Sequence, residues 1–263
     1  VLRGPFSVLY GNSSGGVISM FTADGGPRPV AEAGTHVGSD GLQRHTVRLS
    51  GTEGAWNYNV GAMRFATDGF REHSAAQRTG FNGKLRYTAS PDTRLTFVVN
   101  AMDMPGVQDP LGLTRAELEA DRRQASPSAL LFDTRKSVDQ LQAGAILEHR
   151  IDAAQSVKLT AWRAQRGTEQ FQSIPVGVQA PPTQPGGVIS LGRDAQGLDA
   201  QWVGKTRLLD RPFTVTAGLS ADELQESRRG YQNFLGTTLG VMGALRRDED
   251  NRVRSVDQYL QGH

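Results

Sequence analysis

Cysteine is absent from the sequence, which excludes disulfide bonds and metal sites built on thiolates. No apolar run reaches 18 residues, so a transmembrane helix is excluded as well. Aromatic residues account for only 7% of the chain and hydrophobic residues for 37%, an average that fits a soluble protein. Transmembrane β-barrels share this average, because only every second residue of their strands faces lipid. The composition therefore leaves both classes open.

The usual patterns of catalytic and metal-binding residues are also missing. Ser7 and Ser13 lie beside glycines but not in a Gly-x-Ser-x-Gly elbow, and segment 11–16 lacks the Lys-Ser/Thr ending of a phosphate loop. The five histidines show neither helical i, i+4 spacing nor a paired motif. The 29 basic and 27 acidic side chains nearly balance, which gives no reason to expect a nucleic acid as partner. We therefore expect no catalytic residue, no bound metal and no cofactor, and the chain is not predicted to be an enzyme.

Most of the chain instead alternates between apolar and polar residues with a period of two, which predicts β-strands. Leu95, Phe97 and Val99, for example, share one face of a segment whose other face carries Thr96 and Asn100. Segments of this kind follow one another along the chain without long helical patterns between them. The ten predicted strands cover residues 30–38, 42–51, 55–66, 78–89, 93–103, 137–151, 156–171, 188–208, 213–225 and 251 to the end.

Short and long connections alternate between these strands. This asymmetry is typical of an outer-membrane barrel, whose turns are short on the periplasmic side and whose loops are long on the outer side. The connection 39–41 departs from the rule, since it is short but falls on the side of the long loops. In one long loop, Thr114 as N-cap and Glu117 three residues later predict a short surface helix over 114–121. The short turns are 52–54, 90–92, 152–155 and 210–212, and the long loops are 67–77, 104–136, 172–187 and 226–250.

The chain opens with VLRGPFSVLYGNSSGGVISMFT, in which short apolar segments surround a polar turn rich in glycine. Gly11, Gly15 and Gly16 allow the positive φ angles that tight turns need. The order Val-Leu-Arg-Gly-Pro, then Leu-Tyr-Gly, then Gly-Gly-Val-Ile-Ser resembles the last motif of the plug domain in TonB-dependent outer-membrane receptors of the ferric-siderophore type. The glycines and prolines of segment 23–29 then predict a linker between plug and barrel.

The resemblance implies an all-β fold with two parts. Residues 1–24 would form the C-terminal end of the plug domain, and residues 25–263 the N-terminal part of an antiparallel up-and-down transmembrane β-barrel. About nine or ten strands would make this barrel partial, since transporters of this kind have about 22 strands. Because the plug motif lies at the first residue, we expect the chain to be a fragment whose export signal and most of the plug lie upstream.

The function implied by the resemblance is transport across the outer membrane of a Gram-negative bacterium. Receptors of this family take up scarce large solutes, most often ferric siderophores. The TonB–ExbB–ExbD complex of the inner membrane would supply the energy through the missing upstream segment. Outer-membrane lipid and lipopolysaccharide would surround the barrel.

Two alternatives remain open. The ligand could be cobalamin, haem, copper or a sugar, because no residue pattern identifies it. A non-transporting structural or adhesive β-protein would also be rich in strands. A soluble sandwich, however, predicts no alternation of long and short connections, and a simple porin predicts no plug motif before the first strand.

Several charged residues and glycines are candidates for functional roles. Arg3 lies in an apolar segment and must find an acidic partner or water. We expect it to anchor the plug to the barrel wall, with Glu148 as the first candidate partner. Gly11, Gly15 and Gly16 would let the plug turn closely against the lumen. Basic pairs in the predicted outer loops suit an anionic iron chelate, although lipopolysaccharide phosphates or solvent could equally bind them: Arg122 and Arg123, Arg228 and Arg229, and Arg246 and Arg247.

Five aromatic residues are candidates for the girdle that β-barrels place at the membrane interfaces, with ordinary packing as the alternative. Trp162 differs from the others, because it shares parity with Lys158 and Thr160 and should face the lumen. The candidates are Trp56, Tyr58, Trp162, Trp202 and Tyr259.

Overall fold

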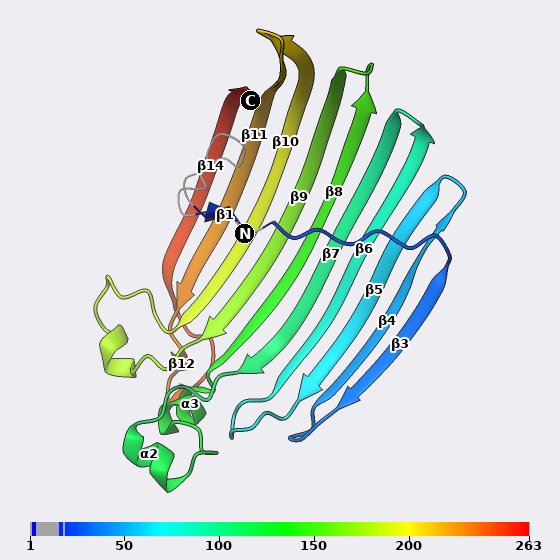
Figure 1. The fold of residues 1–263 in the computed structure, drawn as a ribbon. Coiled ribbons are helices and arrows are strands. Elements are labelled where there is room, and N and C mark those ends of the chain that lie inside the picture. The colour runs from blue at the N-terminus through cyan, green and yellow to red at the C-terminus, as the bar shows by residue number, and fades with distance from the viewer. Residues whose placement is uncertain (1, 4–15, 18, 263) are drawn as a thin grey trace.

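A computed structural model of the chain describes residues 2–3, 16–17 and 19–262. Its main feature is an antiparallel sheet of ten strands, in which each strand pairs with the next along the chain (Figure 1). The prediction of a partial, meandering antiparallel sheet is confirmed. The strands are β3 (Val30–Val37), β4 (Gln43–Glu53), β5 (Trp56–Thr67), β6 (Ala76–Ser90), β7 (Thr93–Gln108), β8 (Arg135–Arg150), β9 (Gln155–Phe171), β10 (Val188–Leu208), β11 (Arg211–Tyr231) and β14 (Leu245–Gly262).

The prediction of a long loop over 226–250 is wrong at both ends. Strand β11 continues to Tyr231 and β14 begins at Leu245, so the connection covers only 232–244. The many charged residues of this segment suggested a loop, yet they lie opposite one another in the strands, with Arg228 facing Glu249. Pairs of opposite charge across two antiparallel strands stabilise them where the strands extend into water.

The short and long connections lie at opposite ends of the sheet, as the sequence predicts (Figure 1). At the short end, the Asp152 carboxylate accepts hydrogen bonds from the backbone N–H groups of Ala154 (2.7 Å) and Gln155 (2.8 Å). The hydrogen bond from Ala154 is the main reason why the pKa of Asp152 lies below its usual value. Such side-chain caps let the backbone reverse within a few residues.

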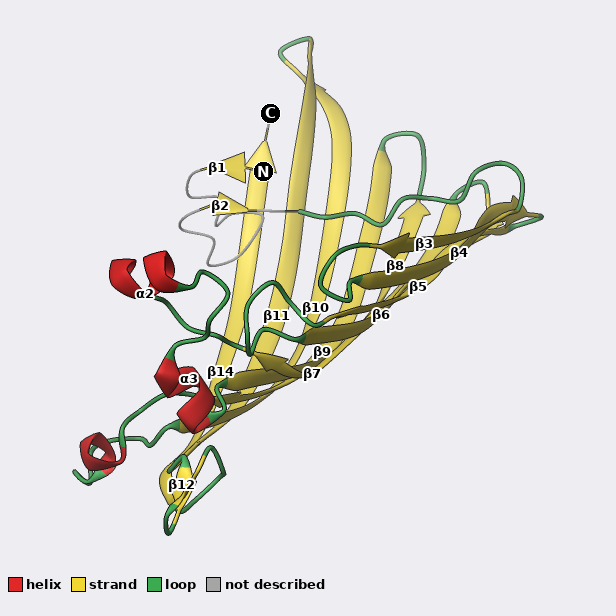
Figure 2. Ribbon diagram, turned by 90° about the horizontal axis from the view of Figure 1, so that it is seen from below, coloured by secondary structure: helices red, strands yellow, loops and turns green. Residues whose placement is uncertain are grey.

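The long connections carry the helices. The predicted surface helix is confirmed: Thr114 and Glu117 form a capping box, and the backbone N–H of Thr114 lowers the pKa of the Glu117 carboxyl. No helix within the described part of the chain has the length and apolar character needed to cross a membrane. The elements at this end of the sheet, shown in Figure 2, are α2 (Arg115–Ala120), α3 (Pro127–Phe132), η1 (Val176–Gln179) and the small hairpin of β12 (Phe234–Leu235) and β13 (Thr238–Leu239).

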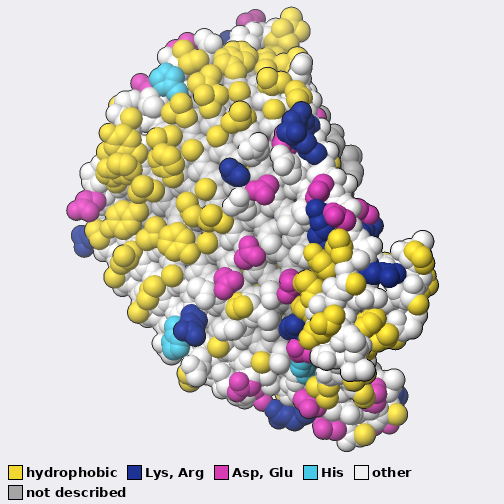
Figure 3. All heavy atoms as spheres, turned by 180° about the vertical axis from the view of Figure 1, so that it is seen from behind, with side chains coloured by type: hydrophobic (Ala, Val, Ile, Leu, Met, Phe, Trp, Pro, Cys, Tyr) yellow, Lys and Arg dark blue, Asp and Glu magenta, His cyan; other side chains and the backbone are white. Residues whose placement is uncertain are grey.

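The two faces of the curved sheet differ in chemistry. Hydrophobic side chains gather over the convex face, whereas charged side chains gather nearer to the loops (Figure 3). Leu198, Val256 and Leu260 on this face are 64%, 70% and 72% exposed. The concave face carries mainly polar and charged side chains, among them Lys84 and Arg86. Such a sheet buries little apolar surface of its own, and its apolar face suits a lipid environment.

The small buried core lies at the base of the loops. Its members come from the connection between β7 and β8 and from the loop ends of β8, β9 and β10. They fix the long connections to the sheet. The buried hydrophobic residues are Ala125, Ala129, Phe132, Val138, Phe171 and Val188.

The aromatic candidates divide between the two faces. Trp56, whose ring lies 4.5 Å from that of Tyr87, and Trp202 belong to the convex face near the short turns, where a membrane girdle is expected. Trp162 faces the lumen, as its parity predicts. The girdle assignment is wrong for Tyr259, which points to the concave face and donates a hydrogen bond to Asp199 (3.3 Å). Tyr58 shares the parity of Trp56.

The beginning of the chain lies on the concave side. Strands β1 (Leu2–Arg3) and β2 (Gly16–Val17) pair with each other in a separate two-stranded sheet and add no strand to the ten-stranded wall. Residues 19–29 then cross the concave face to reach β3 (Figures 1 and 2). This segment is called the linker below.

Candidate functional site

The linker is held to the concave wall by one acidic residue. Asp24 forms ion pairs with Lys84 (2.6 Å) and Arg86 (2.8 Å), two neighbours on the same face of β6. Lys84 also donates a hydrogen bond to the Thr22 carbonyl (2.9 Å). The hydrogen bond from Lys84 is the main reason why the pKa of Asp24 lies below its usual value, although partial burial opposes the shift. The Lys84 side chain is only 15% exposed, so this ion pair is partly shielded from solvent.

Side-chain amides of β5 bind the linker backbone beside this ion pair. Asn57 accepts a hydrogen bond from the Gly25 N–H (3.0 Å) and donates one to the Gly25 carbonyl (2.8 Å). Asn59 donates to the Ala23 carbonyl (2.9 Å). A Cβ atom at Gly25 would collide with the backbone of Gly51 and Tyr58, so glycine is required for this close approach. The linker therefore follows a defined path over β4 to β6.

The other half of the concave wall carries a cluster of three acidic side chains. Asp199 on β10, Asp222 on β11 and Asp257 on β14 face the lumen from three neighbouring strands. Trp162 and Asp222 both lie over the Cα atom of Gly197, where there is no side chain to separate them. We call Asp199, Asp222 and Asp257 the acidic patch. Three carboxylates on neighbouring strands favour a cationic partner.

The long loops are joined into one layer by buried polar contacts. Arg71, in the connection between β5 and β6, donates to the carbonyls of Leu111 (2.6 Å) and Gln124 (2.9 Å) in the connection between β7 and β8. Gln179 and Asn233 are fully buried and share a hydrogen bond of 2.7 Å between the η1 loop and the loop of β12 and β13. These contacts give the loop end a fixed shape.

The predicted plug residues lie mainly outside the described part of the chain. Gly11 and Gly15 are not described. Gly16 lies in β2 and Arg3 in β1, but the side chain of Arg3 is outside the description. A contact between Arg3 and Glu148 therefore stays a prediction.

Glu148 lies on the concave face of β8, as the sequence predicts. It is exposed and is opposite Arg94 on β7 and Lys158 on β9. Two cations thus flank it from the neighbouring strands.

Four of the six predicted ligand-binding arginines do not lie in loops. The misplaced loop boundaries near 226–250 explain the difference, since strand pairing continues through these charged residues. Only Arg122 and Arg123 lie in a connection, between α2 and α3. The other four lie in strands: Arg228 and Arg229 on β11, and Arg246 and Arg247 on β14.

Several of these arginines bind other parts of the chain. Arg229 pairs with Asp248 (2.8 Å) and Asp250 (3.0 Å), and Arg246 donates to the Pro181 carbonyl (2.6 Å). These side chains are partly occupied by structural contacts.

The first arginine pair lies beside an aromatic ring. Arg123 pairs with Asp40, and its guanidinium lies 4.8 Å from the ring centroid of Phe70. Arg122 is exposed to solvent. Among the six, Arg122 is therefore the side chain most available to a ligand.

The sequence alone does not predict the residues that hold the linker. Asp24 stands in a cluster of glycine and proline, which indicates only a flexible connection. An acidic residue in such a linker, together with Lys84 and Arg86 spaced two apart on the polar face of a strand, is the signal that could have found the contact. Within residues 19–262, no group of three or more histidine and acidic side chains is arranged to hold a metal ion.

No protein-family model matches this sequence. Solved structures match it over nearly its whole length. The pyoverdine outer-membrane receptor FpvA from Pseudomonas aeruginosa PAO1 superposes with a TM-score of 0.79 at 18% identity, covering 99% of this chain and 42% of FpvA. The ferric-catecholate import receptor Fiu from E. coli K12 superposes with a TM-score of 0.76 at 13% identity, and the match covers 99% of this chain and 46% of Fiu. BauA, the ferric preacinetobactin receptor from Acinetobacter baumannii, superposes with a TM-score of 0.73 at 14% identity, and the match covers 95% of this chain and 39% of BauA.

The chain thus spans about two fifths of the length of the structures it matches. They are transport receptors, not enzymes. At these identities the likeness concerns the fold: the ten-stranded sheet is part of a barrel of the type found in TonB-dependent receptors, which confirms the fold implied by the opening motif.

Proposed function

We propose that this chain is part of a TonB-dependent receptor in the outer membrane of a Gram-negative bacterium. Residues 1–24 are the end of its plug domain, and residues 25–263 are the first ten strands of its barrel. The observation that carries the proposal is the placement of the linker: a segment preceding the wall crosses its concave face and binds there through Asp24. A soluble sandwich or an adhesive β-protein has no reason to place a charged segment across one polar face.

The substrate is proposed to be a ferric siderophore. Three of the similar receptors are named for ferric chelates, which supports this ligand class over cobalamin, haem, copper or sugars. Arg122 is the first candidate for contact with an anionic chelate, because its guanidinium is exposed at the loop end. Loops fixed on a rigid scaffold are suited to such recognition.

Energy for transport would come from the TonB–ExbB–ExbD complex. A pull on the plug must be resisted by the wall, and the ion pairs of Asp24 are one place where the two meet. These contacts can break and re-form, because the Asp24 side chain is still 43% exposed and a solvent-accessible ion pair has a modest net stability.

The proposal can be tested by uptake of radioactive iron. The gene containing this segment would be deleted in its bacterium, and cells would be supplied with ⁵⁵Fe bound to catecholate, hydroxamate or citrate chelators. Loss of uptake for one chelate, restored by the intact gene but not in a strain lacking TonB, is the expected result. Normal uptake of every chelate, with loss of cobalamin or haem uptake instead, would reassign the ligand. Loss of cell adhesion without any transport defect would favour the structural alternative.

The loop arginines can be compared in the same strain. Arg122→Glu should raise the KM for the chelate several-fold, because it removes an available cation. Arg247→Glu is the matched control, since Arg247 already pairs with Glu249 at 2.6 Å. Equal effects of the two changes would contradict a specific role for Arg122.

A further inference from the structure

The connection between β7 and β8 contains a loop that is attached to the rest of the chain only at its base. Residues 112–122, called the head below, include α2 and project beyond the end of the sheet (Figures 1 and 2). No residue of α2 is buried. Among the described residues, the hydrogen bonds and ion pairs of the head stay within it or run to Arg123 and Gln124. Residues 109–111 and 123–124, called the neck, therefore decide how the head is oriented.

One side chain from another connection holds both sides of the neck. Arg71 lies between β5 and β6 and directs its guanidinium group at the neck carbonyls. On one side, Nη1 donates a hydrogen bond to Leu111 (2.6 Å) and Nη2 donates one to Pro110 (3.2 Å). On the other side, Nε (3.0 Å) and Nη2 (2.9 Å) both donate to Gln124. The planar fork of the arginine thus joins the two segments between which the head begins and ends.

The neck backbone is held in a conformation that it would seldom adopt by itself. Leu111 has a φ angle of 55°, in the left-handed region that is uncommon for a residue with a Cβ atom. Such a conformation persists only where the surrounding contacts hold it. The backbone N–H of Glu72, next to Arg71, adds a hydrogen bond to the Arg123 carbonyl (2.7 Å). The neck is therefore a fixed base for the exposed head.

Arg122, the last residue of the head, lies directly beside this base. We propose that Arg71 is a positioning residue for the anionic chelate: it fixes the place from which Arg122 meets the solute. The four hydrogen bonds of Arg71 go to the neck, so its own guanidinium is already engaged. A loop that is ordered before binding loses less conformational entropy when the ligand arrives, which raises affinity without a new contact. The inference rests on the proposed function, because it takes an anionic iron chelate as the solute.

The test is a double-mutant cycle on uptake of the ⁵⁵Fe chelate that wild-type cells transport, with the complete receptor in each strain. R71Q should raise the KM about fivefold and leave the maximal rate unchanged, because the head must then be ordered during binding. R71K should lose most of the same affinity, since an ammonium keeps the charge but lacks the planar fork. In an R122Q background, R71Q should add less than about twofold, because the cation that Arg71 positions is gone.

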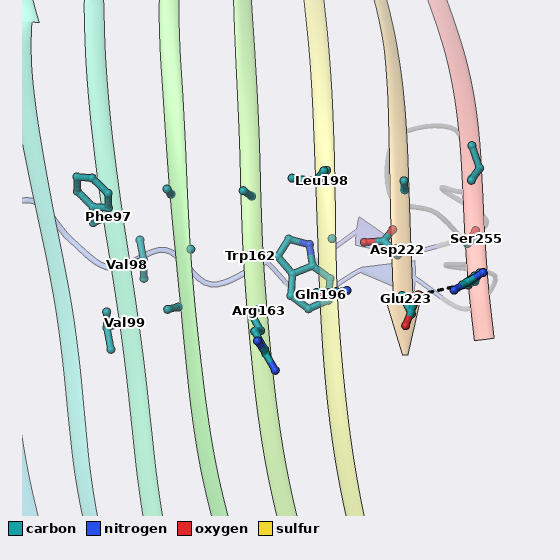
Figure 4. Close-up of a pocket in the computed structure, with 18 residues that line it drawn as sticks. Phe97, Val98, Val99, Trp162, Arg163, Gln196, Leu198, Asp222, Glu223 and Ser255 are labelled. Atoms are coloured by element: carbon teal, nitrogen blue, oxygen red, sulfur yellow. Dashed lines mark hydrogen bonds and ion pairs between the residues drawn. The ribbon is translucent and has the colours of Figure 1, made fainter. Parts of the chain in front are cut away.

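The matched control is R163Q. Arg163 is an arginine on the convex face of the wall (Figure 4), 65% exposed and 3.5 Å from Asp194. Its replacement removes the same charge without touching the loops, so the KM should stay at the wild-type value. Heat-modifiable migration on gels shows whether each variant is a folded barrel.

Hydrogen exchange of the purified receptor without chelate measures the head directly. Amides of residues 112–122 should exchange several-fold faster in R71Q than in the wild type or R163Q. Insertion of two glycines after Gly112 loosens the head while Arg71 stays in place, which keeps the test open if R71Q does not fold. A Cβ atom at Gly112 would meet nothing within 4 Å, so there is room for the insertion, and we expect the same rise in KM as in R71Q.

Additive effects of R71Q and R122Q would overturn the proposal, because a residue that acts through Arg122 cannot add to its loss. Full affinity in R71K, an unchanged KM in R71Q or in the insertion variant, or unchanged exchange of the head would overturn it as well. Absence of uptake of every chelate by wild-type cells would instead remove the proposed function, and this inference with it.

Discussion

The two halves of the concave wall carry opposite charges at the same height. On β6, Lys84 and Arg86 are cationic and bind Asp24 of the linker. On β11, Asp222 belongs to the acidic patch, and a single register row connects Lys84 to Asp222 across the intervening strands. We call the part of the wall around Lys84 and Arg86 the cationic half and the part with the acidic patch the acidic half. The cationic half has its counter-charge, Asp24, in the linker. We infer that the wall is suited to a segment of mixed charge, with its acidic part over β6 and a basic part over β11.

The largest effect on the cationic half is expected from a steric change. Gly25→Val places a side chain against the backbone of Gly51 and Tyr58, which cannot move without breaking the sheet. The linker should leave the wall, at a cost of about 3 kcal/mol or more in docking free energy. Limited proteolysis of the folded receptor would measure this as rapid cleavage within residues 19–29.

Gly26 provides the control for this change. A Cβ atom at Gly26 has no neighbour within 4 Å, so Gly26→Val should leave the cleavage rate nearly unchanged. Equal protection of both variants would show that the linker does not depend on its close approach at Gly25.

Reversing the charges of the cationic half should have the next largest effect. The double variant K84E/R86E places two carboxylates beside Asp24 and removes three polar contacts to the linker. We expect docking to weaken by about 2 kcal/mol, which corresponds to a roughly thirtyfold increase in undocked linker. Leakage of a large antibiotic into cells would report the loosened plug.

Arg94→Glu is suited as control, since Arg94 lies on the same face of the next strand, opposite Glu148. If R94E cells leak as much as K84E/R86E cells, then general wall charge and not the Asp24 contact controls the plug.

The sequence predicts the strands well because each depends on a local alternation between an apolar and a polar face of the sheet. The bounds of β10 agree with the prediction at both ends. The failures occur where tertiary partners decide. Arg228 indicates a loop in the sequence, because its partner Glu249 lies opposite it only once β11 and β14 are paired. Asp24 has no local pattern at all, because its role depends on two side chains 60 residues or more away in the sequence.

Low pH should weaken the docking of the linker in the wild-type receptor but not in a variant with a neutral residue at position 24. The pKa of Asp24 is held below its usual 3.8 by Lys84, so the docked linker favours the ionised carboxylate. Its contribution is complete above pH 3.8 and is lost as the pH falls through the depressed pKa of the docked state. Pepsin cleavage of the linker should therefore accelerate as the pH falls below 3.8 and through the depressed pKa of Asp24. In the Asp24→Asn variant, docking of the linker should be weaker by about 1 kcal/mol at pH 6, and its cleavage rate should not respond to this pH change. A wild-type cleavage rate as flat as that of Asp24→Asn would contradict the ion-pair account.

The smallest effect is expected from Arg3, whose anchoring role tests the acidic half. Arg3→Ala should leave barrel assembly intact and loosen the plug by less than about 1 kcal/mol, since single ion pairs in a wet lumen are weak. The identity of its partner can be found by charge exchange, comparing R3E/E148R with R3E/D222R for recovery of antibiotic exclusion. Glu148 already lies between Arg94 and Lys158, whereas Asp222 lies among carboxylates, so a cation gains more beside Asp222. Strand β1 also lies toward β11 and β14 on the concave side (Figures 1 and 2). We therefore expect recovery with D222R and little with E148R. Recovery with E148R alone would assign the anchor to Glu148, and normal exclusion in Arg3→Ala cells would show that Arg3 is not an anchor.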